Sequence, residues 1–150
     1  MPSPTGVLVH GAWGGGWNWQ PVAAGLRELR LEVLVVETLP SASGDPALGL
    51  SADTEFLRKV IDELPGGVIL VGHSYGGMVV SQLAGDPKVA GAVYLTAFWP
   101  KEGASFVDAA GGKLASWIEI DETSGLTRIA AEAVAKVVTG GMSDKESQAV

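Results

Sequence analysis

Four short runs of apolar residues constrain most strongly what this chain can fold into. They are Val7–Val9, Val33–Val36, Val68–Val71 and Val89–Leu95. Runs of this length, rich in valine and leucine, are typical of strands buried on both faces of a sheet. Because segments with helical periodicity separate them, residues 1–96 alternate strand and helix. This alternation predicts an α/β fold, in which helices cover both faces of a parallel sheet.

Three helices are expected between the strands, over residues 18–31, 51–64 and 75–84. Ser51 is a suitable N-cap for the second helix, and the carboxylates of Asp53 and Glu55 would lie near its positive end. Residues 38–50, before that helix, are rich in proline, serine and glycine, which predicts a loop.

The last third of the chain has a different pattern. Residues 97–150 contain no further run typical of a buried strand, and residues 126–138 have helical periodicity. Ser143 and Glu146 have the spacing of a capping box, which predicts that another helix begins there. The chain ends four residues after Glu146, too soon for a stable helix, so we expect this sequence to be a piece of a longer one.

Composition excludes several classes of function. The 150 residues include 10 Lys and Arg against 17 Asp and Glu, a formal charge of −7. A chain this acidic, without a basic stripe, is not expected to bind nucleic acid or an anionic membrane. It has no cysteine, which excludes disulfides, thiolate nucleophiles and cysteine-based metal sites. Without a secretory signal pattern or a span of ~20 apolar residues, the expected location is the cytoplasm.

The strongest chemical signal is Gly72-His73-Ser74-Tyr75-Gly76, a G-x-S-x-G sequence. It lies between an expected strand and an expected helix, where a sharp turn lifts a serine hydroxyl off the sheet as a nucleophile. Gly72 and Gly76 let the strand and the helix approach closely, and the helix start directs free N–H groups to the same place. Ser74 is therefore the candidate nucleophile. An ordinary glycine-rich connection is the alternative.

A second glycine-containing turn, His10-Gly11-Ala12-Trp13, directly follows the first expected strand. Acyl transfer develops negative charge on a carbonyl oxygen, and backbone N–H groups in such a turn can stabilise that charge. The expected donors of this oxyanion hole are the main-chain N–H groups of Ala12 and Tyr75.

The chain has only two histidines, and both are expected to be structural. His10, at the end of a buried strand, is expected to brace the turn that follows it. A catalytic role is the less favoured alternative. His73 lies on the elbow itself, and its side chain is expected to point away from the Ser74 hydroxyl.

These segments together resemble the α/β-hydrolase family, in particular its plant-type esterase and hydroxynitrile lyase group. His10–Trp19 is similar to the oxyanion segment of that group, Gly72–Met78 to its elbow, and Tyr94–Pro100 to its sixth strand and cap entry. The resemblance implies a three-layer sandwich with a mostly parallel sheet, a partial α/β-hydrolase fold that starts at the family's third strand. Residues 1–100 would form the N-terminal part of the core, and residues 101–150 an incomplete helical cap.

This chain departs from the family mainly because it lacks the catalytic partners of the serine. In the family, the acid follows the seventh strand and the histidine follows the eighth, and this chain stops before both. Asp108 and Asp121 lie in the expected cap, where solvated carboxylates are the favoured interpretation. A serine hydroxyl without a base is a weak nucleophile, so a His and an Asp from further sequence would complete the site.

The resemblance implies a carboxylesterase-like serine hydrolase that cleaves a small ester or related acyl substrate, without a metal or cofactor. Trp13, Phe98 and Trp99 are expected to line its apolar pocket, with packing in the core or cap as the alternative. A hydroxynitrile lyase is less favoured, because Gly11 stands where that group has a hydroxyl residue. Families with an aspartate nucleophile are disfavoured by Ser74.

Two further hypotheses belong to other classes. The missing base and acid are consistent with an inactive fragment or a binding module that keeps the pocket. In addition, the outer edge of the fourth expected strand, Val89–Leu95, has no partner strand, and a bare apolar edge pairs readily with another chain. Self-association through this edge is therefore expected as well.

Overall fold

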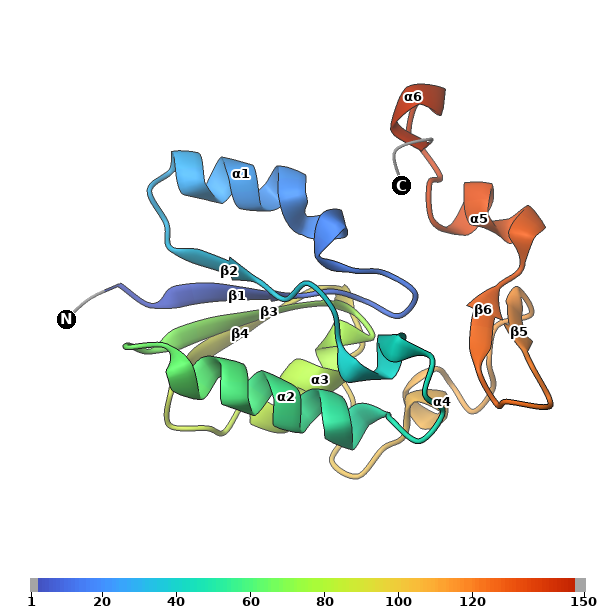
Figure 1. Cartoon of the computed structure of the whole chain (residues 1–150), viewed down its shortest axis with the longest axis horizontal. Coiled ribbons are helices and arrows are strands. Elements are labelled where there is room, and N and C mark those ends of the chain that lie inside the picture. The colour runs from blue at the N-terminus through green and yellow to red at the C-terminus, as the bar shows by residue number, and fades with distance from the viewer. Residues whose placement is uncertain (1–2, 148–150) are drawn as a thin grey trace. The chain divides into compact units, whose positions relative to one another are not determined.

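The structure is a computed structural model that describes residues 3–147 (Figure 1). The chain divides into two compact units, Met1–Gly112 and Lys113–Val150, which are treated separately below. The division into a core of residues 1–100 and a cap of residues 101–150 stays a prediction.

A four-stranded parallel sheet forms the centre of the first unit. Its strands are β1 (Thr5–Val9), β2 (Val33–Val35), β3 (Val68–Ser74) and β4 (Val89–Ala97). Their order is β2-β1-β3-β4, and every neighbouring pair is parallel. The α/β architecture with a parallel sheet, predicted from the alternation of apolar runs and helical segments, is confirmed.

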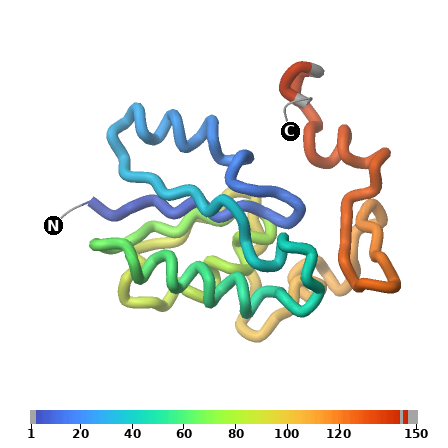
Figure 2. The backbone as a smooth tube through the Cα atoms, viewed as in Figure 1, coloured from blue at the N-terminus to red at the C-terminus, as the bar shows by residue number. Residues whose placement is uncertain are grey.

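Helices cover both faces of this sheet (Figure 1). The helices α1 (Gln20–Glu28), α2 (Leu50–Glu63) and α3 (Gly76–Leu83) lie close to the expected ranges. After β1 the chain turns back through the short helix η1 (Gly16–Trp19) into α1, as the trace in Figure 2 shows. On the α1 face, Leu8 of β1 packs with Trp19 and Ala23. The opposite face carries α2 and α3.

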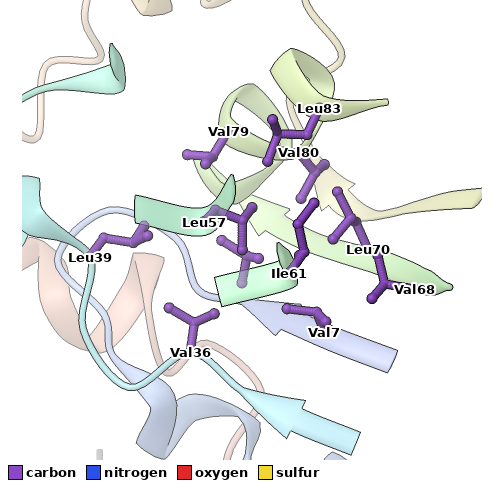
Figure 3. Close-up of a cluster of buried hydrophobic side chains, with 11 residues drawn as sticks. Val7, Val36, Leu39, Leu57, Ile61, Val68, Leu70, Val79, Val80 and Leu83 are labelled. Carbon is purple, nitrogen blue, oxygen red and sulfur yellow. The ribbon is translucent and has the colours of Figure 1, made fainter. Parts of the chain in front are cut away.

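The larger core lies between the sheet and helices α2 and α3 (Figure 3). Leu57 and Ile61, one turn apart on α2, are fully buried against strand side chains that include Val7 and Leu70. Each such side chain stabilises the fold by about 1.5–3 kcal/mol relative to an exposed one. From β3, this core includes Val68 and Leu70, a few residues before Ser74.

The start of α2 differs from the expectation. Ser51 was expected to be the N-cap, but the helix begins at Leu50 after Gly49, which has an extended backbone and no side-chain cap. Ser51 therefore lies within the first turn. The N–H of Asp53 donates to the Gly49 carbonyl, and the Asp53 side chain is turned inward and buried.

The second unit contains a two-stranded antiparallel sheet and two short helices. The elements are β5 (Ile118–Ile120), β6 (Thr127–Ile129), α5 (Ala131–Val137) and α6 (Asp144–Ser147). As expected, a capping box opens α6: the Ser143 N–H donates to Glu146 Oε2 at 2.9 Å, and the Glu146 N–H to Ser143 Oγ at 3.4 Å.

The prediction of a helix over residues 126–138 is wrong for the first part of this range and confirmed for Ala131–Val137. Thr127–Ile129 pair with β5, and Arg128 forms an ion pair of 2.6 Å with Glu119. A turn in which Asp121 Oδ1 accepts the Thr123 N–H reverses the chain and gives this segment a strand partner. Helical periodicity is a local signal, and here the pairing across the turn overrides it.

No helix within residues 3–147 is both long and apolar enough to cross a membrane. The cytoplasmic location stays a prediction.

Candidate functional site

Ser74 is the last residue of β3 and has a left-handed backbone conformation, with φ +50°. Residues other than glycine rarely adopt this conformation, and where they do the strain is often part of a functional site. Tyr75 follows with φ −55° and ψ −30°, and α3 begins at Gly76. The chain thus changes from strand to helix across Ser74 and Tyr75, which is the geometry of a nucleophile elbow.

Two glycines make this turn sterically possible. A Cβ added to Gly72 would lie 2.7 Å from the main-chain carbon of Gly76, and one added to Gly76 would lie 2.6 Å from the Val9 carbonyl oxygen. Both distances are shorter than a Cβ can tolerate. The first turn of α3 therefore packs directly on the ends of β1 and β3.

The two glycine-containing turns meet at Gly11. β1 and β3 are neighbours, with Val9 opposite Gly72, so the residues after β1 lie beside Ser74. A Cβ on Gly11 would be 2.9 Å from the Ser74 Cβ and 3.2 Å from the His73 carbonyl oxygen. This contact brings Ala12, the next residue, close to the candidate nucleophile.

The main-chain N–H groups of Ala12 and Tyr75 are the donors that the sequence predicts for the oxyanion hole. Within residues 3–147, neither N–H donates to a protein acceptor. Two donors without an acceptor, in the segments that flank Ser74, are what an oxyanion site requires.

His10 is buried, and both of its ring nitrogens are engaged. Nε2 accepts the N–H of Leu39 at 3.2 Å, so the ring proton is assigned to Nδ1, which donates to the Gly11 carbonyl at 2.8 Å. The ring therefore joins the turn after β1 to the loop before η2 (Pro40–Ser43). In this arrangement neither nitrogen is free to act as a base.

The half-buried ring of His73 lies edge-on against Trp19, with centroids 6.4 Å apart and planes at 88°. The pKa of His73 is lowered, first by burial and second by the neighbouring His10. Ser74 Oγ makes no hydrogen bond to any residue in the range 3–147. Neither histidine of the chain is thus hydrogen-bonded to Ser74.

Asp53 is the residue that sequence reasoning missed. Its side chain is 0% exposed, and its carboxylate accepts three hydrogen bonds. The donors are the Ser41 N–H at 2.8 Å, the Ser41 hydroxyl at 2.6 Å and the Tyr75 hydroxyl at 2.8 Å. The pKa of Tyr75 is raised, first by burial and then by this bond to Asp53.

A signal for this burial was present in the sequence. Asp53, Leu57 and Ile61 are spaced by four residues and share one face of α2, and all three are fully buried. The sequence alone places Asp53 only near the positive end of this helix, where an acid is favoured without being buried.

Asp108 and Asp121 are exposed, and each accepts hydrogen bonds from residues two or three positions away in the sequence. Asp108 Oδ2 accepts the N–H and the hydroxyl of Ser105 at 2.9 and 2.7 Å, and these bonds lower the pKa of Asp108. The pKa of Asp121 is lowered by hydrogen bonds from the main chain of Thr123 and Ser124. Within the described range, no three histidine or carboxylate side chains are grouped to hold a metal ion.

Phe98 is tied to the elbow through the main chain, because its N–H donates to the Ser74 carbonyl at 3.1 Å. Its ring lies edge-on to Phe106, with centroids 4.9 Å apart. Phe106 belongs to α4 (Phe106–Ala109) and also lies edge-on to Tyr75 at 6.1 Å. The sequence had not pointed to Phe106 as a neighbour of this site.

The two tryptophans expected in the pocket differ in their surroundings. Trp13 is 38% exposed and has φ +58°, in the turn that carries Ala12. Trp99 is 80% exposed and stacks on Tyr94, with centroids 5.5 Å apart and planes at 22°. Their role as pocket residues stays a prediction.

Comparison with known sequences gives a consistent set of relatives. A model of the Alpha/beta hydrolase family matches residues 7–145. The carbendazim hydrolyzing esterase of Nocardioides sp. (strain SG-4G) is 41% identical over 112 residues, 67% of this chain and 45% of that protein. Methylesterase 1 of Arabidopsis thaliana is 35% identical over 105 residues, 63% of this chain and 39% of that protein. The chain thus spans less than half the length of these relatives.

Solved structures agree with this result. An extracellular alpha/beta-hydrolase from a Paenibacillus species superposes with a TM-score of 0.63 at 28% identity, covering 71% of this chain and 46% of that one. The Arabidopsis methylesterase MES16 superposes with a TM-score of 0.78 at 20% identity, covering 97% of this chain and 63% of that one. At this low identity the second match establishes the fold alone.

Proposed function

Because this chain belongs to the alpha/beta hydrolase family, we propose that it is a carboxylesterase-like serine hydrolase that cleaves a small ester or a related acyl substrate. One observation carries this proposal: Ser74 stands at φ +50° between β3 and α3, with Gly11 of the second turn against its Cβ. The similarity to proteins named as esterases supports an ester as the substrate class.

In the proposed reaction, Ser74 Oγ attacks the carbonyl carbon of the ester. The oxygen of the tetrahedral intermediate accepts hydrogen bonds from the N–H groups of Ala12 and Tyr75. A base takes the proton of the Ser74 hydroxyl during this attack and gives it to the alkoxy oxygen as the bond to that oxygen breaks. The alcohol leaves, and an acyl group remains on Ser74. Water then attacks this acyl group and releases the acid. One such donor is worth about 10²–10³ in rate.

The base and the acid of the reaction are proposed to come from sequence beyond residues 1–150. Neither His10 nor His73 is bonded to Ser74, and His10 uses both nitrogens elsewhere. Asp108 and Asp121 are engaged in turns of their own. The resemblance to the family implies that the acid follows the seventh strand of the fold and the histidine the eighth. Without a base, the chain keeps only the residual rate that an oxyanion site and substrate binding provide.

Trp13, Phe98 and Trp99 are proposed to contact the acyl or alcohol part of the substrate. Phe98 has the firmest support, because its main chain is bonded to the Ser74 carbonyl. Phe106 extends the same aromatic surface toward Tyr75.

A non-catalytic binding module is the second candidate function. The observation that favours it is the absence of a hydrogen-bonded base at Ser74 Oγ within residues 3–147. Such a protein would keep the site and bind an ester without cleaving it.

Hydrolysis of p-nitrophenyl acetate separates the two functions. The purified protein, with whatever sequence naturally flanks residues 1–150, is compared with Ser74→Ala and with Ser51→Ala, a matched change at an exposed serine of α2. A serine hydrolase loses its activity in Ser74→Ala and keeps it in Ser51→Ala. Equal rates in all three proteins would contradict catalysis by Ser74 and favour the binding module.

A further inference from the structure

Building on Ser74 as the proposed nucleophile, we propose that Asp53 is a positioning residue, which fixes the oxyanion donor of residue 75 through the Tyr75 side chain. Asp53 does not touch the substrate in this proposal. It accepts a hydrogen bond from the Tyr75 side chain, and the main-chain N–H of Tyr75 contacts the substrate.

The burial of Asp53 is the first support. A carboxylate removed from water is costly unless hydrogen bonds replace its hydration. At Asp53 three donors do so, all from Ser41 and Tyr75, at 2.6–2.8 Å. A residue that only favoured the start of α2 could do so from an exposed position.

The position of Tyr75 is the second support. It lies between the strained Ser74 and the first residue of α3, so rotation of its backbone would redirect the peptide N–H that faces the oxyanion. Its hydroxyl is held by Asp53, and its ring lies edge-on to Phe106. Because both the ring and the hydroxyl are held, rotation of the main chain at residue 75 would break these contacts.

The third support is the segment Leu39–Ser41, here called the brace. Its hydrogen bonds lead to residues beside both proposed N–H donors. At one end the Leu39 N–H donates to His10, whose ring in turn donates to the Gly11 carbonyl, next to Ala12. At the other end Ser41 donates twice to Asp53, which accepts from Tyr75. Two sets of hydrogen bonds, joined by the main chain of the brace, thus connect the two turns that are proposed to supply the N–H groups.

A double-mutant cycle tests this assignment, with Tyr75→Phe, Asp53→Asn and the combined variant. Tyr75→Phe removes the hydroxyl and keeps the ring, while Asp53→Asn keeps the shape and removes the charge. The matched control is Tyr94→Phe, which also loses one phenol hydrogen bond, of 2.9 Å to Ser81 Oγ. A fluorophosphonate gives the binding constant and the phosphonylation rate constant separately.

We expect each single variant to lower the phosphonylation rate constant by about 10- to 100-fold, with little change in the binding constant. The combined variant should be no slower than the slower single variant, because both changes remove the hydrogen bond from the Tyr75 hydroxyl to the Asp53 carboxylate. Tyr94→Phe should match the wild type. Additive losses, an effect on binding alone, or equal slowing in Tyr94→Phe would overturn the assignment.

A second measurement does not depend on activity. The N–H of Met78 donates to the Tyr75 carbonyl at 2.8 Å, and the N–H of Phe98 to the Ser74 carbonyl at 3.1 Å. In Tyr75→Phe and Asp53→Asn, hydrogen exchange should become faster at these two amides and stay unchanged in β1. Unchanged exchange at both, or a uniform increase through the sheet, would overturn the positioning role. If the wild-type protein, with the sequence that naturally flanks residues 1–150, is not phosphonylated, the proposed hydrolase fails, and hydrogen exchange alone decides the role of Asp53.

Discussion

Gly11 and Ser74 are in such close contact that a Cβ added to Gly11 would lie 2.9 Å from the Cβ of Ser74. The contact exists because β1 and β3 are parallel neighbours, so both turns leave the sheet at the same end. Parallel α/β sheets bind their ligands outside the carboxyl ends of the strands. The fold therefore brings together two segments that are far apart in the sequence.

Substitution Gly11→Ala should damage both stability and the site. The added methyl group has backbone atoms of His73 and the Cβ of Ser74 as neighbours, and neither can move away freely. We expect a loss of about 1–3 kcal/mol in the free energy of unfolding, measured by urea denaturation.

The matched control for this prediction is Gly25→Ala in α1, where a Cβ meets no atom within 4 Å. Alanine in a helix is favoured over glycine by about 0.5–1 kcal/mol, so this variant should be as stable as the wild type or more so. Equal stability of Gly11→Ala and the wild type would contradict the close contact.

His10→Ala should destabilise the brace. The Leu39 N–H and the Gly11 carbonyl would each lose a partner, and the Leu39 N–H donates to a fully buried ring nitrogen. An unsatisfied buried group costs about 1–3 kcal/mol, in addition to the lost packing of the ring. Thermal unfolding measures the loss, and an unchanged melting temperature would show that the ring does not brace the loop.

His73 gives the protein a pH-dependent stability near neutrality. Its pKa in the folded state lies below the usual value of 6.5, so the folded protein binds this proton more weakly than the unfolded chain does. Unfolding then takes up a proton as the pH falls below 6.5, and the free energy of unfolding decreases.

The measurement is urea denaturation at a series of pH values from neutral down to about 5, above the range in which carboxylates titrate. The wild type should lose stability across this range, and His73→Gln should lose less. An identical slope in both proteins would assign the pH dependence to another group.

The edge of β4 should mediate self-association. Within residues 3–147, β4 pairs only with β3, and Val93 and Leu95 on this strand are each 47% exposed. An apolar edge of this kind favours pairing with a second chain, and a lysine on it opposes pairing. In size-exclusion chromatography, the 150-residue chain should elute as an oligomer and Val93→Lys as a smaller species.

Leu29→Lys is the control, because Leu29 is 72% exposed at the end of α1 and lies outside the sheet. It should elute with the wild type. A wild type that is monomeric at high concentration would contradict association through β4.

The architecture could be predicted because short valine-rich runs and the helices between them leave few alternatives to a parallel sheet. The strand–turn–helix geometry at Ser74 follows from the same logic, since the glycines at 72 and 76 are needed only if strand and helix meet there. These features depend on local sequence and on the handedness of the connections.

Asp53 and the strand Thr127–Ile129 could not be predicted in the same way. The spacing of Asp53 with Leu57 and Ile61 marks the buried face of α2. No local rule, however, pairs its carboxylate with Ser41 and Tyr75, whose hydrogen bonds make the burial possible. Thr127–Ile129 forms a strand because a turn supplies a partner, although its periodicity favours a helix. The first outcome depends on contacts between distant segments, and the second on pairing across a turn that overrides the local periodicity.

The account depends most on Ser74 being a reactive nucleophile at the end of β3. The most direct measurement is the site of covalent modification after treatment with a fluorophosphonate, located by mass spectrometry of peptides. We predict one adduct, on Ser74, that disappears in Ser74→Ala and persists in Ser51→Ala. An adduct on another residue, or labelling that is unchanged in Ser74→Ala, would contradict the proposed function.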